Sequence, residues 1–263
     1  MDYENIILTK EQNIATLILN RPQTINAFTQ QMTEEVIAAL NNVALDDDVR
    51  VLIIGGAGRG FCSGHDISVS LFPPGANLEE ARMSTRRGLL RVPVILHRMD
   101  KPTIAMVHGV ALGFGCDLAL ACDLRVASED ARFSQGFLRL GLAPGMGGAW
   151  FLPRLIGLTK AAEFLFTGDF LDAKEADRLG MLNRLVPTDK LEEETMKLAR
   201  HLAKGPPIAI RMAKHLMYRC LQLELEAALE FSNLSETFTL LSEDYKEGEA
   251  AFGEKREAKY EGR

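Results

Sequence analysis

The chain has 263 residues, of which 47% are hydrophobic and 25% are charged, with a formal net charge of −6 and four cysteines. This composition is typical of an ordinary globular protein with one large domain or two small ones. The negative net charge argues against a broad basic surface for nucleic acid. The cysteines form no C-x-x-C pair, so the sequence predicts neither a zinc site nor a disulfide scaffold.

The first five residues, Met1 to Asn5, are acidic and polar, whereas a secretory signal begins with basic residues and continues with an apolar run. No uninterrupted apolar stretch long enough to cross a membrane follows. We therefore expect a cytoplasmic protein with reduced thiols and with neither a membrane nor a nucleic acid as its partner.

Strands and helices alternate through the first half of the chain. Residues 13–19 alternate as a half-buried strand does, and Pro22 stops this strand before a predicted helix at 33–43. Residues 51–54 form a short apolar strand that leads into the glycine-rich loop 55–64. This loop is the first candidate site, because backbone N–H groups in such loops can approach a ligand closely.

The same alternation continues beyond the first glycine-rich loop. A helix is predicted from residue 79 toward residue 98, kinked or broken near Pro93. A strand, a second glycine-rich loop, a buried helix and another strand follow at 102–107, 109–115, 116–121 and 123–127. Glycine therefore stands at the ends of two predicted strands.

From about residue 155 onward the pattern is mostly helical. Thr159 has the character of a helix cap, and helices are predicted at 173–179, 191–204 and 208–241. Neither a flexible linker nor a repeat interrupts the chain. The sequence thus predicts one α/β core with a helical C-terminal portion.

Familiar glycine and serine motifs do not account for these loops. The run Gly55–Gly60 does not satisfy G-x-G-x-x-G, because Phe61 stands where a glycine is needed, and no P-loop lysine follows. Ser63 is misplaced relative to the G-x-S-x-G nucleophile elbow. Neither a nucleotide-phosphate cradle nor a serine hydrolase is supported.

Five stretches in order along nearly the whole chain carry a specific resemblance instead. They are Leu19–Pro22 with Asn26-Ala27, Gly58–Ile67, His108–Asp123, Phe133–Arg154 and Ala251–Arg256. Together they resemble the crotonase family, also called the enoyl-CoA hydratase/isomerase family. Gly58–Phe61 and Phe137–Arg154 look closest to its phenylacetate-pathway ring-epoxide isomerase branch, although Gly145 occupies that branch's aspartate position.

The resemblance implies an α/β fold, in which a crotonase-like spiral of ββα units at about residues 1–200 carries the acyl-CoA site. A helical oligomerisation region, about 201–263, is implied to form homotrimers, often paired into hexamers. The implied substrate is an acyl-CoA, with coenzyme A as part of the substrate and with no separate cofactor and no metal.

The resemblance also implies an oxyanion hole made by the backbone N–H groups of His65 and Phe114, with Gly113 beside them. Phe114 is expected where a helix begins, so its N–H is unpaired within the helix and faces a ligand at the positive end of the dipole. Two such donors would stabilise charge on a thioester oxygen when an α-proton leaves or a nucleophile adds at the β-carbon. The alternative is that the glycines only permit tight turns.

The family's hydratases use two glutamates, and this chain departs from that pattern. The first position falls on Asp117, three residues past Phe114 and therefore on the same helix face. The second falls on Phe137, which cannot transfer a proton. One carboxylate suffices to move a double bond, and Phe137 would dry the pocket, raise the pKa of Asp117 and suit a cyclic or aromatic acyl group. Alternatively, Asp117 merely complements the helix dipole.

Other functions remain open at this stage. The His65 side chain could donate a hydrogen bond or exchange a proton, as in a decarboxylase or thioester hydrolase. A catalytically idle acyl-CoA-binding relative would also keep the two glycine-rich loops. An idle relative is expected to be unaffected by Asp117→Ala, whereas an isomerase or hydratase should lose most of its turnover.

The coenzyme A contacts are likewise implied by the resemblance. Backbone groups around the pantetheine and adenine are those of Thr24, Ile25, Ala27, Ser63, Asp66 and Ile67. Asp66 is expected mainly to hold its loop by hydrogen bonds. Phe252 and Lys255 match C-terminal positions that reach the nucleotide of a neighbouring subunit, and the alternative for them is a solvated terminal helix.

Overall fold

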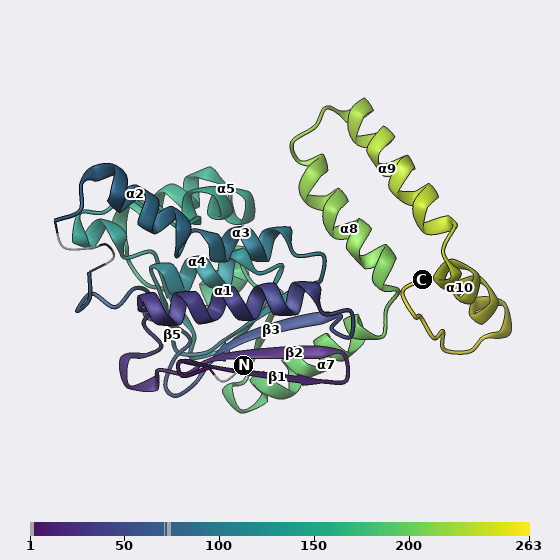
Figure 1. Cartoon of the computed structure of the whole chain (residues 1–263), viewed down its shortest axis with the longest axis horizontal. Helices are drawn as coiled ribbons and strands as arrows, with labels where there is room; N and C mark the ends of the chain where they lie inside the picture. The colour runs from purple at the N-terminus through teal and green to yellow at the C-terminus, as the bar shows by residue number, and fades with distance from the viewer. Residues whose placement is uncertain (1–2, 71, 73–74) are drawn as a thin grey trace.

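The computed structural model describes residues 3–70, 72 and 75–263, which form two sheets flanked by helices (Figure 1). The larger sheet has six described strands in the order β1-β2-β3-β4-β6-β9: Ile6–Glu11, Ile14–Leu19, Val51–Gly56, Thr103–Val107, Leu124–Ser128 and Arg184–Val186. The smaller sheet, within the same described ranges, has the order β5-β7-β8: Val110–Leu112, Arg132–Ser134 and Leu171–Asp172. The predicted α/β class is therefore confirmed.

The larger sheet begins with an antiparallel hairpin and continues as a parallel sheet. Gln12 and Asn13 join β1 to β2 with φ values of 51° and 63°, as a two-residue hairpin turn requires. The strands predicted at 13–19, 51–54, 102–107 and 123–127 are all present. The hairpin partner β1 was not predicted, because its exposed end carries no sustained alternation and only pairing with β2 forms it.

The α-helices lie on both faces of the larger sheet and beyond its edge. They are α1 (Gln30–Leu45), α2 (Leu78–Arg87), α3 (Arg91–Arg98), α4 (Phe114–Ala121), α5 (Gly148–Thr167), α6 (Ala173–Arg178), α7 (Leu191–Ala203), α8 (Pro207–Cys220), α9 (Leu225–Leu240) and α10 (Glu243–Glu254). Short 3₁₀ helices occur at Pro22–Thr24, Phe137–Leu140 and Thr188–Lys190. Within the described ranges, no helix combines the length and the apolar character needed to cross a bilayer.

Alternate side chains of the central strands feed two separate cores, because successive residues of a strand point to opposite faces. Leu52 and Ile54 of β3 pack in the cluster that includes α1, α3 and α4. Val51 and Ile53 of the same strand pack in the cluster formed with α7. The wholly apolar sequence of β3 is thus explained by burial on both faces.

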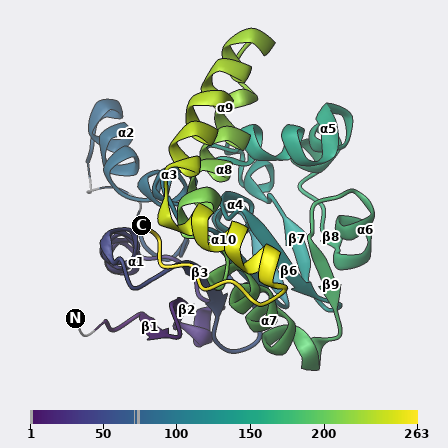
Figure 2. The same ribbon diagram turned by 90° about the vertical axis from the view of Figure 1, so that its right-hand side faces the viewer.

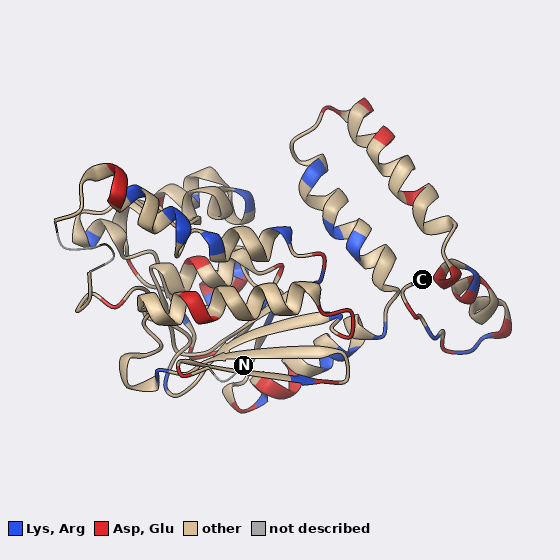
Figure 3. Cartoon of the chain, viewed as in Figure 1, with Lys and Arg blue, Asp and Glu red and all other residues tan. Residues whose placement is uncertain are grey.

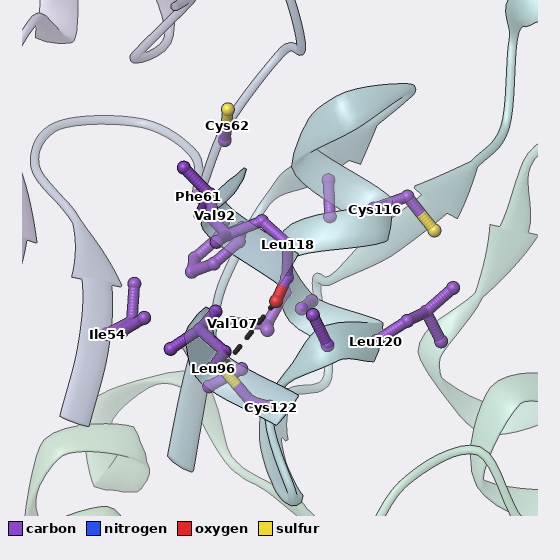
Figure 4. Close-up of a cluster of buried hydrophobic side chains, with 14 of the residues drawn as sticks. Ile54, Phe61, Cys62, Val92, Leu96, Val107, Cys116, Leu118, Leu120 and Cys122 are labelled. Carbon is purple, nitrogen blue, oxygen red and sulfur yellow. Dashed lines mark hydrogen bonds between the residues drawn. The ribbon is translucent and has the colours of Figure 1, made fainter. Parts of the chain in front are cut away.

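Helix α4 is embedded in the first of these cores, and every one of its residues is buried. Figure 4 shows Cys116, Leu118 and Leu120 projecting from this helix in different directions into the surrounding cluster. Burial raises the pKa of the Cys116 thiol and, to about 12, that of Cys122, so both thiols are neutral packing groups near neutral pH. Anything placed on α4 is therefore held by a rigid core.

Two helix predictions require correction. The helix predicted from 79 toward 98 is broken at Gly88–Leu90 and not at Pro93, which lies in the first turn of α3, where its missing N–H removes no helical bond. The stretch predicted at 208–241 is two helices, α8 and α9, joined by a turn at residues 221–224. Amphipathic periodicity continues across this turn, so the sequence pattern did not reveal it.

The C-terminal helices extend away from the sheet, with α8 and α9 side by side and α10 crossing beyond them (Figures 1 and 2). Helix α8 carries Arg211, Lys214 and Arg219 with no acidic residue, whereas α9 carries Glu226, Glu230 and Glu236 with no basic one (Figure 3). Arg211 and Lys214 of α8 pair with Asp100 and Asp123 of the core and not with the acidic residues of α9.

A buried polar cluster attaches α8 to the core. Lys214 donates from Nζ to Asp123 Oδ2 at 2.7 Å and to the carbonyl oxygens of Leu96 and Lys101. The hydroxyl of Tyr218 donates to Asp123 Oδ1 at 2.9 Å. The backbone N–H and the hydroxyl of Thr103 both donate to Asp123 Oδ2. Every oxygen of the buried carboxylate is thus hydrogen-bonded, as a buried charge requires.

Breaking this cluster is expected to destabilise the protein. Lys214→Met leaves Asp123 buried without its cation, so the free energy of unfolding should fall by about 3 kcal/mol. Urea denaturation measures the loss. The matched control is Lys204→Met, which removes only an exposed pair with Glu257 and should cost less than about 1 kcal/mol. Equal losses in the two variants would contradict the buried-pair argument.

Candidate functional site

The first glycine-rich loop is paired along its length with the loop that follows β2. Ser63 donates from its backbone N–H to the oxygen of Ile25 and from its hydroxyl to the oxygen of Thr24, both at 2.8 Å. Phe28 and His65 form a parallel bridge, in which Asp66 donates to the oxygen of Phe28. The structure thus brings together most of the residues predicted to surround coenzyme A.

Two side chains lock this pair of loops. Asn26 is fully buried and donates from Nδ2 to the oxygens of Ala57, Gly60 and Phe61. Arg21 pairs with Asp66 at 3.2 Å and donates to the oxygen of Ala27. Hydrogen bonds from Ser68 lower the pKa of Asp66 below its usual value, and the nearby Arg21 guanidinium lowers it further. Asp66 therefore hydrogen-bonds within its own loop and pairs with Arg21.

The second glycine-rich loop contains β5 and is paired with the first loop. Cys62 and Ala111 form a parallel bridge, and the Cys62 oxygen accepts from Leu112. A Cβ on Gly115 would lie 2.2 Å from the Cys62 oxygen, so only glycine fits there. A Cβ on Gly64 would lie 2.8 Å from the Leu112 oxygen. The glycines therefore permit close approach between the two loops in addition to any binding role.

This approach brings the two predicted oxyanion donors onto neighbouring segments. Gly64 precedes His65, and a Cβ placed on Gly64 would lie 3.5 Å from the backbone nitrogen of Phe114. Phe114 is the first residue of α4, after Gly113 at the N-cap, and its ring packs edge-on against Phe28 at 4.8 Å between centroids. Within the described part of the chain, neither the His65 N–H nor the Phe114 N–H donates a hydrogen bond. Both donors are thus available to an anionic ligand atom.

Asp117 lies in the first turn of α4 and is fully buried. Its Oδ1 accepts from Gln135 Nε2 at 2.8 Å, whereas its Oδ2 has no hydrogen-bond partner among the described residues. Burial raises the pKa of Asp117 to about 7, and hydrogen bonds from Gln135 and the backbone of Gly148 oppose part of this rise. A carboxyl with such a pKa can both accept and deliver a proton near neutral pH.

Gln135 is a site residue that sequence reasoning missed. It follows β7, whose parallel pairing with β5 sets Ser134 opposite Leu112 and so brings Gln135 next to the start of α4. Its exposed fraction is 1%, and its Oε1 has no partner among the described residues. The only signal available in the sequence was its place in the family-like stretch Phe133–Arg154.

Phe137 occupies the position expected for a second acid or base. It is half-buried, and its ring lies about 3.8 Å from where a Cβ on Gly113 would stand, immediately before the Phe114 donor.

A cavity of about 1070 Å³ lies between α3 and the start of α5, and its lining includes Gly145 to Gly147. Gly148, the next residue, approaches Asp117 Oδ1 closely. The apolar lining of this cavity includes Leu90, Pro93, Met146, Trp150 and Phe151.

The His65 side chain lies on the other side of the α2–α3 junction. It lines a smaller cavity, of about 260 Å³, together with Thr33 of α1 and Thr29, the N-cap of that helix. Its Nε2 is 3.1 Å from the oxygen of Val69, whereas its Nδ1 is buried and has no partner in the described ranges. The ring is therefore oriented by its own loop and not by Asp117.

Two predicted contacts, Phe252 and Lys255, are not gathered with the others. Ile67 belongs to the first loop, next to Asp66, and its side chain is 82% exposed. Phe252 is 89% exposed near the end of α10, and Lys255 caps that helix with a φ of 55°. Helix α10 lies at the opposite end of the chain from the paired loops (Figure 1). The described residues contain no cluster of His, Cys, Asp and Glu that could hold a metal ion.

Comparison with known proteins identifies the family. A sequence model described as enoyl-CoA hydratase/isomerase matches residues 9–263. The chain is 38% identical to crotonyl-CoA hydratase of Syntrophomonas wolfei over 261 residues, and 34% identical to 1,2-epoxyphenylacetyl-CoA isomerase of Escherichia coli over 260 residues, with 99% of each chain covered in both cases.

Solved structures agree with this result. A crystal structure of enoyl-CoA hydratase from Bacillus anthracis superposes with a TM-score of 0.93 at 32% identity, covering 99% of this chain and 100% of the other. The predicted crotonase-like fold, with its sheets and C-terminal helices, is confirmed. The chain therefore belongs to the enoyl-CoA hydratase/isomerase family, whose members act on acyl-CoA thioesters.

Proposed function

We propose that this enzyme isomerises the double bond of an enoyl-CoA or hydrates it, with Asp117 as its main acid and base. The observation that carries the proposal is the buried Asp117, with a pKa near 7, three residues past Phe114 on the same rigid helix, where the N–H of Phe114 donates to no described residue. The thioester oxygen would accept from the N–H groups of His65 and Phe114. Such donors are worth a few kcal/mol where negative charge develops.

One carboxylate completes either reaction. In isomerisation, Asp117 removes a proton from one carbon, the electron pair moves through the enolate whose oxygen the two N–H groups hold, and the same proton returns to another carbon. In hydration, water adds its oxygen to the β-carbon, Asp117 takes the proton that water loses, and this proton then goes to the α-carbon. Phe137 supplies no second carboxylate for either sequence.

The acyl group would extend from the oxyanion donors past Asp117 into the cavity beside α5. The aromatic and aliphatic part of its lining favours a bulky acyl group, beside arginines at positions 82, 86, 91 and 98, and the ring of Phe137 beside Gly113 favours a cyclic one. The relative from Escherichia coli is named for a ring-bearing phenylacetyl-CoA derivative, which is consistent with this proposal.

Coenzyme A would lie against the paired loops, next to the backbone of Thr24, Ile25, Ala27, Ser63, Asp66 and Ile67. Phe252 and Lys255 lie too far from the paired loops of their own chain to contact this coenzyme A. They would instead contact coenzyme A bound to a neighbouring subunit of a homotrimer or of a dimer of trimers. The exposed apolar side chains Met217, Leu221, Leu225, Leu229, Leu234, Phe238 and Leu241 favour such an assembly. Four free cysteines are in keeping with a cytoplasmic location.

A substrate panel tests the proposal. Crotonyl-CoA, a 3-enoyl-CoA and a cyclic enoyl-CoA would be followed at the thioester absorbance with the wild-type enzyme, and turnover of at least one is expected. Binding of all three without turnover would instead favour the idle acyl-CoA-binding relative.

A decarboxylase or thioester hydrolase that uses His65 is the second candidate, because the His65 Nδ1 is buried and has no partner among the residues that the structure describes. His65→Ala keeps the backbone N–H and is expected to retain turnover within about tenfold, since the side chain is not needed for the oxyanion hole. Loss of turnover in His65→Ala, together with release of carbon dioxide or free coenzyme A by the wild type, would favour the second candidate.

The pH dependence of turnover is expected to follow Asp117. The carboxylate must be ionised to take the first proton, so kcat should rise with pH through a midpoint near 7. A profile of kcat between pH 5 and pH 9 measures this midpoint. A midpoint near 4, the ordinary value for an exposed aspartate, would show that Asp117 is not the group that titrates.

A further inference from the structure

Gln135 is a buried polar residue to which the proposed reaction assigns no role. Its side chain reaches Asp117 of α4 from the end of β7, because β7 pairs with β5 and β5 leads directly into α4. A buried amide is normally hydrogen-bonded on both its nitrogen and its oxygen. Here the nitrogen donates to Asp117 Oδ1 at 2.8 Å, whereas the oxygen has no partner among the described residues.

A third element fixes this contact. Gly148 begins α5, and a Cβ at this position would lie 2.7 Å from Asp117 Oδ1 and 2.6 Å from Gln135 Oε1. Both distances are shorter than real Cβ contacts allow, so only glycine leaves the amide and the carboxylate in place. The pair is thus held between α4, the end of β7 and the start of α5.

The contact makes the two oxygens of Asp117 inequivalent. Oδ1 is engaged by Gln135, and Oδ2 is buried with no donor in the described part of the chain. An ionised carboxylate accepts hydrogen bonds through both oxygens, and leaving one buried oxygen unpaired is unfavourable. Such an oxygen is retained where a ligand supplies the missing proton or donor.

We infer that Gln135 is a positioning residue, which anchors Oδ1 of Asp117 so that Oδ2 is the atom that exchanges the proton with the acyl group. This inference rests on the proposed function. The same N–H donor stabilises the ionised carboxylate and so opposes the effect of burial on the pKa of Asp117. Removing the donor should therefore change both the geometry and the proton affinity of the acid and base.

The test compares Gln135→Met with Gln135→Glu. Gln135→Met keeps the length of the side chain and removes the donor, so the midpoint of the kcat profile should rise by about one pH unit. Misplacement of Oδ2 should lower the maximal kcat by about 10- to 100-fold, with KM changed less than about threefold. Gln135→Glu puts a second carboxyl next to Asp117, so its midpoint should rise by about two units.

Two further variants separate positioning from folding. Ser134→Ala, in the same strand, removes a buried hydrogen bond to the oxygen of Gly168 without touching Asp117, and its kcat midpoint should equal that of the wild type. Gly148→Ala keeps every hydrogen-bonding group, but its Cβ must displace the amide and the carboxylate, so a fall in kcat of about tenfold is expected together with a loss of stability that urea denaturation measures.

The outcomes distinguish this inference from the proposed function. If Asp117→Asn abolishes turnover but Gln135→Met keeps the wild-type midpoint and maximal kcat, the positioning role is overturned and the proposed function stands. If Asp117→Asn leaves turnover unchanged, the proposed function itself fails. A midpoint shift in both Gln135 variants and none in Ser134→Ala supports the inference.

Discussion

Asp117→Asn is expected to lower kcat by about 10³-fold, because it removes the only carboxylate that the proposed reaction uses. The substitution preserves the shape of the side chain, and an asparagine oxygen can still accept from Gln135 Nε2 at the position of Oδ1. KM should change by less than about threefold, since the N–H groups of His65 and Phe114 bind the thioester in both proteins. Steady-state kinetics at pH 8 measures both constants.

The matched control for this loss is Asp172→Asn. Asp172 caps α6 by accepting from the backbone of Glu175, and asparagine caps helices equally well. Its kcat should equal that of the wild type. A loss of less than about tenfold in Asp117→Asn would mean that another group moves the proton, and the half-buried His65 would then be the first alternative.

Much of the fold could be predicted because its signals are local. The apolar run of β3 and the glycines that follow it mark a buried parallel strand and a close backbone approach, and the structure has both. The turn that separates α8 from α9 carries neither glycine nor proline, so continuous amphipathic periodicity hid it. The break at Gly88 was assigned to Pro93, because proline is the stronger breaker unless it stands in a first turn.

The site could be predicted only where one segment supplies it. Phe114 and Asp117 share a helix turn, so their spacing indicated a common face, and the structure has both on α4. Gln135 meets Asp117 through a pairing of β5 with β7 that no local pattern reveals. The position of Phe252 similarly depends on how α10 is carried away from the core, which no local pattern in the sequence reveals.

Asp117→Asn is also expected to remove a pH-dependent instability. The pKa of Asp117 is raised from 3.8 to about 7 in the folded protein, so between these values the folded state binds a proton that the unfolded state has lost. Stability contributed by this group is therefore complete below about pH 4 and falls as the pH rises toward 7. The shift of about three units corresponds to about 4 kcal/mol above pH 7.

Urea denaturation of the wild type and of Asp117→Asn, at pH 4.5 and pH 8 and at one protein concentration, measures this effect. The asparagine amide at the position of Oδ2 lacks an acceptor and costs about 1–3 kcal/mol, but this cost is the same at both pH values. The difference in unfolding free energy between the two proteins should therefore move in favour of Asp117→Asn by about 3–4 kcal/mol from pH 4.5 to pH 8. A constant difference would mean that Asp117 is not held at a raised pKa, and the same variant would then have lost its activity for another reason.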